Sequence, residues 1–218
     1  EEFESHRIAV CTSLVGGSGL DTSGHGTKVA SRVAGRMSGF GYWSGICSYR
    51  CMDRGDSVAS VLAVCAAIDR ATQDAVQIIN LSMMVRGDEL ALRRECRRAR
   101  DAGVLIVASS VPGGSWPADY DGVLAIGYED SRRQVSADLV DMGRSVTVCG
   151  GRTVSGVSYA TARVSGLLIN AVERLMQAGQ VFDVEDFWRA LPDLREDGCL
   201  NTARLDEWVT KTSELNKV

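Results

Sequence analysis

Two residues in this chain have side chains suited to nucleophilic catalysis, and each lies one or two residues after a glycine. Ser158 lies in segment 156–162 (GVSYATA), which is followed by apolar residues at helical spacing. His25 lies in segment 24–35 (GHGTKVASRVAG), which also predicts a glycine turn that opens a helix. A helix N-terminus presents unpaired backbone N–H groups that favour developing negative charge. A serine hydroxyl placed there, with a histidine as its base, is the arrangement that covalent catalysis requires.

The elements that must position these two residues alternate between strands and helices. Alternation of this kind predicts a parallel sheet covered by helices on both faces, with the active site at the carboxyl ends of the strands. We expect strands at 8–11, 46–52, 75–82, 104–109, 123–128, 135–139 and 145–149. We expect helices after His25 and at 58–71 (with Asp56 and Ser57 as candidate caps), 88–101, 158–178, 184–191 and 204–210.

Length and composition bound the class of protein. The chain has 218 residues, of which 45% are hydrophobic, and this is enough for one domain with a large core. No linker or repeat divides it, so we expect a single domain over residues 1–218. The net charge of −4 gives no reason to expect nucleic-acid binding, and no apolar run approaches the length of a membrane span.

The seven cysteines are scattered and include no Cys-x-x-Cys pair. We expect them to be buried free thiols in a reducing cytoplasm, with no zinc site and no cofactor. The first seven residues (EEFESHR) are not a secretory signal. The alternative is a secreted protein from which a signal or propeptide has been removed.

Together, the two glycine motifs resemble those of the subtilisin-like serine peptidases, the subtilases. Further segments resemble that family in the right order: the strand before its substrate-binding edge, the next central strand, its proline-containing turn with the strand that follows, and its tail. These segments are 77–83, 102–108, 116–127 and 197–203. The similarity covers roughly residues 7–208. It implies an α/β fold of the subtilisin-like type, with a mainly parallel central sheet, helices on both faces and shortened loops.

The resemblance also shows where the catalytic pattern changes. A subtilase triad needs an aspartate at the end of the first strand, and Thr12 stands at that position in segment 8–14 (IAVCTSL). A threonine hydroxyl accepts a hydrogen bond from the histidine but brings no charge, and losing this charge costs about 10⁴ in turnover in serine peptidases. Asp21, four residues before His25, is an alternative source of the acid. We expect Ser158 and His25 to lie near hydrogen-bonding reach and Thr12 to face His25.

The oxyanion and substrate positions change as well. Pro112 stands where the family has the asparagine that stabilises the oxyanion, and the loss of one such donor costs about 10²–10³. Ser110 or the N–H groups of Gly113 and Gly114 are possible substitutes. The family's substrate edge carries two glycines where this chain has Met84 and Val85, so the main specificity pocket is expected to be narrow. The expected substrate-binding residues are Ser82, Met83, Met84, Val85, Ser109, Ser110 and Val111.

These changes leave two main functional hypotheses. The first is a pseudopeptidase that binds an extended peptide or protein partner with little or no turnover. The alternative is a specialised serine endopeptidase that uses a Ser158–His25 dyad to process a peptide precursor. A purely structural role in an assembly is a third and smaller hypothesis. The sequence makes no prediction of the oligomeric state or of the partner's identity.

Overall fold

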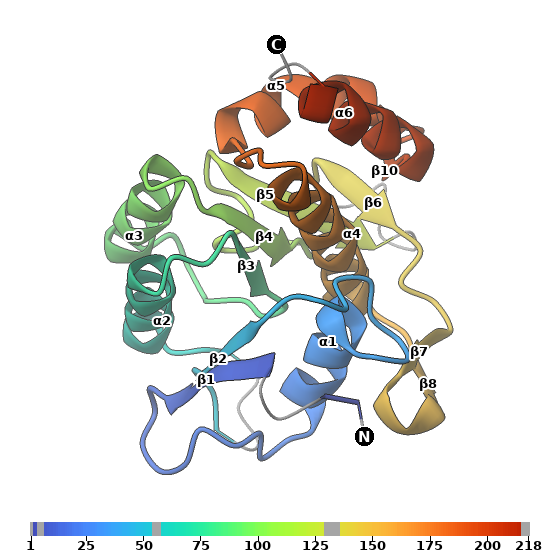
Figure 1. Cartoon of the computed structure of the whole chain (residues 1–218). Coiled ribbons are helices and arrows are strands. Elements are labelled where there is room, and N and C mark those ends of the chain that lie inside the picture. Colours follow the sequence, from blue (N-terminus) through green and yellow to red (C-terminus); the bar gives the residue numbers. More distant parts are fainter. Residues whose placement is uncertain (1, 4–6, 54–57, 129–135, 215–218) are drawn as a thin grey trace.

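A computed structural model describes residues 2–3, 7–53, 58–128 and 136–214 of the chain (Figure 1). Its strands are β1 (Ile8–Ser13), β2 (Ile46–Arg50), β3 (Ile78–Leu81), β4 (Leu105–Ser109), β5 (Val123–Tyr128), β6 (Leu139–Asp141), β7 (Val146–Val148), β8 (Arg152–Val154), β9 (Arg195–Glu196) and β10 (Cys199–Leu200). Its helices are α1 (His25–Ala34), α2 (Val61–Gln73), α3 (Leu90–Asp101), the short 3₁₀ helix η3 (Cys149–Gly151), α4 (Val157–Gln177), α5 (Val184–Leu194) and α6 (Thr202–Glu214).

The centre of the molecule is a four-stranded parallel sheet in the order β3-β4-β5-β6. Helix α4 packs across all four strands on one face, and α3 packs on β4 with α2 beside it (Figure 1). The strands β4 and β5 are buried almost throughout, as expected for a parallel sheet with both faces covered. The predicted α/β class, with a mainly parallel central sheet and helices on both faces, is therefore confirmed.

The first two strands form a separate parallel pair, in which Thr12 lies opposite Tyr49. Figure 1 shows β2 between β1 and β3, and no pairing joins β2 or β1 to β3 among the described residues. The pairing register also shifts between Ile8 and Val10. The sequence predicted these strands but not this separation from the main sheet.

Several local predictions need correction. The strand expected at 135–139 is found at 139–141, and its first expected residue lies outside the described part of the chain. Two short antiparallel pairs, β7-β8 and β9-β10, were only partly expected. The candidate caps Asp56 and Ser57 also lie outside the described residues, and α2 begins after Ser60.

The core has two main parts, one on each face of the sheet. One packs beneath α2 and α3 around Ile68 and Leu92, and the other packs among α4, α5 and α6 around Phe187, which is 0% exposed. None of the seven cysteines is in a disulfide, but only Cys51 and Cys96 are buried, so the expectation of buried thiols was wrong for the other five. Within the described ranges, no helix has the length and hydrophobicity to span a membrane.

Candidate active site

Ser158 occupies the first turn of α4, where the sequence predicted a nucleophile. The helix is entered through Gly156, whose φ of 138° lies in a region that side chains rarely adopt, so a glycine is needed at this turn. The Ser158 side chain is half-buried, and its hydroxyl donates a hydrogen bond of 3.3 Å to the backbone carbonyl of Ser82. The first N–H groups of a helix have no partner within the helix, so this turn can stabilise an anion beside the hydroxyl.

A chain of polar contacts fixes Ser158 to the end of β3. The Ser82 hydroxyl donates to the Ser158 carbonyl at 2.8 Å and accepts from the side-chain amide of Asn80 at 3.0 Å. The side-chain amide oxygen of Asn80 accepts in turn from the hydroxyl of Ser165, a residue of α4 that is 0% exposed. Three hydrogen bonds therefore join the first part of α4 to the end of β3 and the residue that follows it, and two of them involve Ser158 itself. Sequence reasoning missed Asn80 and Ser165, because their only signal is a polar residue within an otherwise apolar element.

His25 is the first residue of α1, and its side chain is exposed. Helix α1 packs against α4, and the His25 ring meets the ring of Tyr159 edge-on, with 5.8 Å between the ring centroids. Tyr159 is the residue after Ser158, so the two candidate catalytic residues come to neighbouring helix N-termini. Among the described residues no hydrogen bond joins the two side chains. Tyr159 was not singled out from the sequence.

The Asp21 side chain forms hydrogen bonds with the turn around His25. Its carboxylate accepts from the N–H groups of Ser23, Gly24 and Thr27 at 2.9, 2.8 and 2.7 Å, and from the Thr27 hydroxyl at 2.7 Å. Partial burial raises the pKa of Asp21, but these hydrogen bonds, led by Thr27, outweigh burial and hold the pKa well below its ordinary value. The structure therefore gives Asp21 a capping role at the start of α1.

The contacts of the described residues do not join Thr12 to the serine or the histidine, so the expectation that it faces His25 stays a prediction. It is exposed on β1, which lies on the side of β2 that faces away from β3 (Figure 1). His25 and Ser82 line a cavity between β2 and β3, and Thr12 is not on its wall. No hydrogen bond within the described ranges connects Thr12 to His25.

The segment at the oxyanion position is built largely without free donors. Pro112 is exposed and has no N–H. Ser110 uses its N–H on the Ile126 carbonyl at 2.8 Å and its hydroxyl on the Ser136 carbonyl at 2.9 Å, so it does not serve as the substitute donor. Gly113 and Gly114, which have φ of 93° and 98°, remain as candidates, together with the backbone N–H of Ser158.

The expected substrate-binding residues lie on both sides of this region. Ser109 is buried, and its hydroxyl lies 2.8 Å from that of Thr161 on α4; Val111 is half-buried. The Val85 side chain is only 2% exposed, and its N–H donates to the Trp116 carbonyl at 2.9 Å. Met83 and Met84 are half-buried, and the Met84 carbonyl accepts a hydrogen bond from the Ala59 N–H at 3.2 Å. An incoming chain can therefore use only part of the edge at residues 82–85.

No group of three or more His, Cys, Asp or Glu side chains is placed to hold a metal ion in the part of the chain that the structure describes. The groups of this arrangement that are suited to nucleophilic chemistry are a serine hydroxyl, an imidazole and the amides at the start of α4.

Comparison with known proteins identifies the family of this chain. The model of the Subtilase family matches residues 15–187, a range that holds His25 and Ser158 and begins after Thr12. A thermostable alkaline protease of Halalkalibacterium halodurans is 28% identical over 168 residues, which are 67% of this chain and 46% of that protein. Subtilisin DY of Bacillus licheniformis is 28% identical over 181 residues, 71% of this chain and 66% of that protein. The chain thus spans less than two thirds of the length of both relatives.

Among solved structures, the prenylagaramide maturation protease PagA has a similar fold. The two structures superpose with a TM-score of 0.73 at 20% sequence identity, over 93% of this chain and 87% of that one. At this identity the likeness shows the fold alone.

Proposed function

Because this chain belongs to the subtilase family, we propose that it is a serine endopeptidase that uses Ser158 and His25 to process a peptide precursor. The observation that carries the proposal is the position of the Ser158 hydroxyl. It is held at the N-terminus of α4 by the Ser82 carbonyl, one residue from the tyrosine ring that contacts His25. The fold neighbour PagA is a maturation protease, and this supports a precursor peptide as the substrate class.

The proposed reaction begins when the Ser158 hydroxyl turns from the Ser82 carbonyl toward His25. The Ser158 oxygen attacks the scissile carbonyl carbon while His25 takes the proton of the Ser158 hydroxyl. The N–H groups in the first turn of α4 stabilise the resulting oxyanion, and His25 then gives its proton to the leaving amine. Water attacks the acyl-enzyme in the same way and releases the second product. With a neutral Thr12 and no donor from Pro112, this reaction is expected to be slow.

The expected substrate has a small side chain at the bond to be cut. Met84 replaces a glycine of the family pattern and is half-buried, so it narrows the space beside the substrate backbone. Methionine is flexible, and the pocket is therefore expected to adapt to modest changes of side chain.

A second candidate is a pseudopeptidase that binds a peptide or protein partner without turnover. The neutral side chain of Thr12 at the acid position favours it, and so does the lack of a donor at Pro112. Both losses act on the transition state, so they lower turnover more than ground-state binding.

Labelling with a fluorophosphonate probe separates the two proposals. The peptidase predicts an adduct at Ser158 that is identified by peptide mass, is absent in Ser158→Ala and is strongly slowed in His25→Ala. The pseudopeptidase would be established instead if wild type formed no adduct and if a ligand from a peptide library bound Ser158→Ala as well as it bound wild type.

A further inference from the structure

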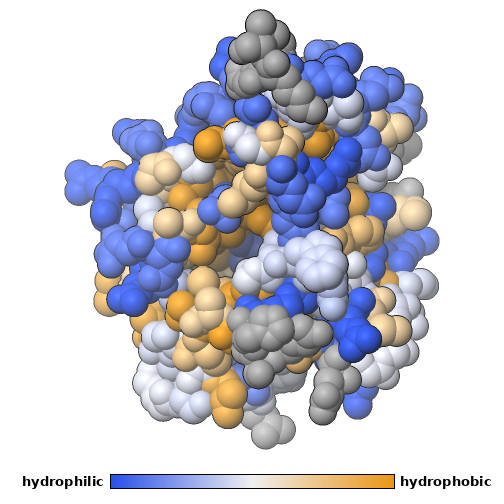
Figure 2. Space-filling model, viewed as in Figure 1, coloured by the Kyte–Doolittle hydropathy of each residue, from blue (hydrophilic) through white to orange (hydrophobic). Residues whose placement is uncertain are grey.

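Helix α3 concentrates positive charge on a protein that is acidic as a whole. Its 12 residues, LALRRECRRARD, include five arginines against one glutamate and one aspartate, whereas the whole chain has a net charge of −4. Figure 2 shows hydrophilic side chains that project from the side of the molecule where α3 lies. A local positive field of this kind attracts acidic partners.

Three of the five arginines form ion pairs with carboxylates within the fold: Arg93 with Asp88, Arg98 with Glu95 and Asp69, and Arg100 with Glu185. The other two, Arg94 and Arg97, are exposed, and their side chains form no hydrogen bond or ion pair with any residue that the structure describes. The positive charge that is free to meet a partner therefore lies at these two positions.

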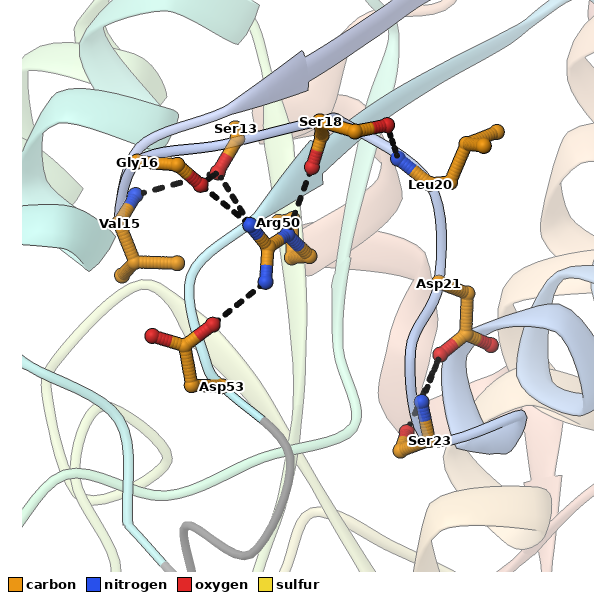
Figure 3. A network of polar contacts seen from close by, with 9 residues as sticks. All are labelled: Ser13, Val15, Gly16, Ser18, Leu20, Asp21, Ser23, Arg50 and Asp53. Atoms are coloured by element: carbon orange, nitrogen blue, oxygen red, sulfur yellow. Dashed lines mark hydrogen bonds and ion pairs between the residues drawn. The ribbon is translucent and has the colours of Figure 1, made fainter.

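Arg50, at the end of β2, shows how an arginine is held when the fold itself uses it. Its guanidinium donates to the Ser18 carbonyl at 2.9 Å and to the Asp53 carboxylate at 2.6 Å (Figure 3). A guanidinium has five N–H donors that suit carboxylates. Those of Arg94 and Arg97 are left for water or for a carboxylate from outside the chain.

Arg94 and Arg97 share the outward face of α3 with Leu90. The three residues have the spacing i, i+4 and i+7, which places them along one side of a helix over about 10 Å. The side of α3 that faces the core carries Leu92, Cys96 and Ala99 instead. Leu90 is 60% exposed, so the outward face combines an apolar side chain with two free cations.

Helix α2 adds a second exposed leucine beside this face. Leu62 is 78% exposed, and it lies two turns before Asp69, which accepts from Arg98 of α3 at 3.1 Å. Leu90 likewise lies two turns before Arg97. The two leucines therefore come to the same end of the packed helices. We call Leu62, Leu90, Arg94 and Arg97 the outer face.

The outer face adjoins the expected substrate edge at residues 82–85. The Ala59 N–H donates to the Met84 carbonyl at 3.2 Å and ties the segment before α2 to this edge. Leu90 follows Val85 by five residues, which span at most about 17 Å. The edge has already used the Met84 carbonyl and the Val85 N–H within the fold, so a substrate gains from contacts outside the cleft.

We propose that the outer face docks an acidic helical segment of the peptide precursor, away from the bond that is cut. Carboxylates of this segment pair with Arg94 and Arg97, and its leucine side chains cover Leu62 and Leu90. The match to an acidic, leucine-containing helix depends only on the outer face. The choice of the precursor as the occupant rests on the proposed peptidase function.

Peptide binding to Ser158→Ala tests the outer face without any cleavage. The probe is a fluorescein-labelled peptide of about 15 residues, made of Leu, Glu and Ala at helical spacing, and its binding is followed by fluorescence anisotropy. A second peptide has Lys in place of every Glu. We expect only the acidic peptide to bind, with an affinity that falls as salt rises from about 0.1 M to about 1 M, because the Debye length shortens from about 10 Å to about 3 Å.

Charge reversal at the outer face should weaken this binding. In the Ser158→Ala background, Arg94→Glu combined with Arg97→Glu should raise Kd by at least about 10-fold, since each reversal removes an attraction and adds a repulsion. Neutral Gln at the same two positions should give a smaller loss. The matched control combines Arg152→Glu with Arg189→Glu, two exposed positions on β8 and α5, and should change Kd by less than about 2-fold.

The leucines give an independent test of the same face. Leu62→Ser combined with Leu90→Ser should weaken binding by at least about 3-fold, because the apolar contact is lost. Val181→Ser, at a site that is 85% exposed, is the control and should leave Kd unchanged. Equal losses in the two charge-reversed proteins, equal binding of the basic peptide, or no effect of the leucine variants would overturn the outer face as a docking site.

A joined peptide tests whether the precursor is the occupant. The acidic peptide is linked through about six residues to an extended segment with Ala at the expected cleavage position. Because the edge and the outer face lie close together, the joined peptide should bind Ser158→Ala at least about 10-fold more tightly than the acidic peptide alone. No gain would assign the face to a different acidic partner and overturn the precursor as its occupant. These affinities stand even if Ser158 of the wild type forms no fluorophosphonate adduct.

Discussion

Replacement of Asp21 tests how the fold positions His25. In the structure the Asp21 carboxylate holds the turn before α1 through hydrogen bonds to Ser23, Gly24 and Thr27. Asp21→Ala removes all of these acceptors at once. We therefore expect the variant to lose stability and to let His25 move relative to Tyr159, because α1 loses its cap.

The magnitude follows from what capping side chains contribute. Replacing a capping Asp with Ala costs about 0.5–2 kcal/mol, and in a domain of this size each kcal/mol lowers Tm by about 2–4 °C, so we expect a loss of about 1–8 °C. The hydrogen bonds to Asp21 keep its pKa below the ordinary value of 3.8 in the folded state. Its contribution is therefore fully present above the unfolded-state pKa and is lost as the pH falls through the lower, folded-state pKa.

The assay is thermal unfolding of wild type and Asp21→Ala as a function of pH. The difference in Tm should be constant from pH 7 down to about pH 5 and should shrink below the ordinary pKa of 3.8. Asp183→Ala is the matched control, since Asp183 caps α5 by accepting from the Asp186 N–H at 2.8 Å. The control should lose similar stability without slowing the labelling of Ser158.

One result would refute this reasoning. If Asp21→Asn leaves Tm unchanged but slows fluorophosphonate labelling of Ser158 by about 10⁴, Asp21 acts as the triad acid and not as the cap. The cap predicts the opposite pattern, with lower Tm and labelling reduced by less than about 10-fold.

Three further predictions concern the acid, the oxyanion donor and a buried thiol. Because Thr12 makes no hydrogen bond to His25 in this structure, Thr12→Asp should change Ser158 labelling by less than about 10-fold, and a gain approaching about 10⁴ would show that the carboxylate reaches His25 and that the missing charge is limiting. Pro112→Asn should raise peptide turnover by up to about 10²–10³ by supplying an amide donor, and unchanged turnover in a peptide assay would count against that role. Burial raises the pKa of Cys51 to about 11. At pH 8 about 10⁻³ of the Cys51 side chain is thiolate, compared with about a quarter of an ordinary thiol. We therefore expect Cys51 to be alkylated at least about 100-fold more slowly than an ordinary thiol. A rate near that of an exposed thiol would show that the structure around Cys51 opens.

The sequence predicted the parts of the fold that depend on local chemistry. Gly24 and Gly156 both adopt positive φ, at 76° and 138°, and each begins the helix that carries a candidate catalytic residue. Strands β3, β4 and β5 and helix α4 follow from apolar runs whose length and periodicity allow little choice. These elements bring Ser158 and His25 to neighbouring helix N-termini, and the predicted hydrogen-bonding reach between the two side chains stays a prediction.

The parts that the sequence did not predict depend on contacts between distant segments. An apolar strand such as β1 pairs equally well with either edge of β2 as far as its own residues are concerned, so its place outside the main sheet has no local signal. The role of Asp21 is similar. Its spacing from His25 allowed a catalytic acid, and only the turn geometry assigns its oxygens to the backbone of Ser23, Gly24 and Thr27.

A chain of hydrogen bonds runs from Ser165 through Asn80 and Ser82 to Ser158, and it stabilises the fold around the serine motif independently of catalysis. Ser165 is fully buried, and a buried polar group without a partner costs about 1–3 kcal/mol, so the fold itself requires these contacts. Ser82 therefore holds the first turn of α4 in place whether or not the hydroxyl of Ser158 reacts. The geometry around the nucleophile can persist after the acid and the oxyanion donor have changed. The presence of this geometry therefore does not by itself distinguish a peptidase from a pseudopeptidase, and the reactivity of Ser158 toward a fluorophosphonate probe tests the difference.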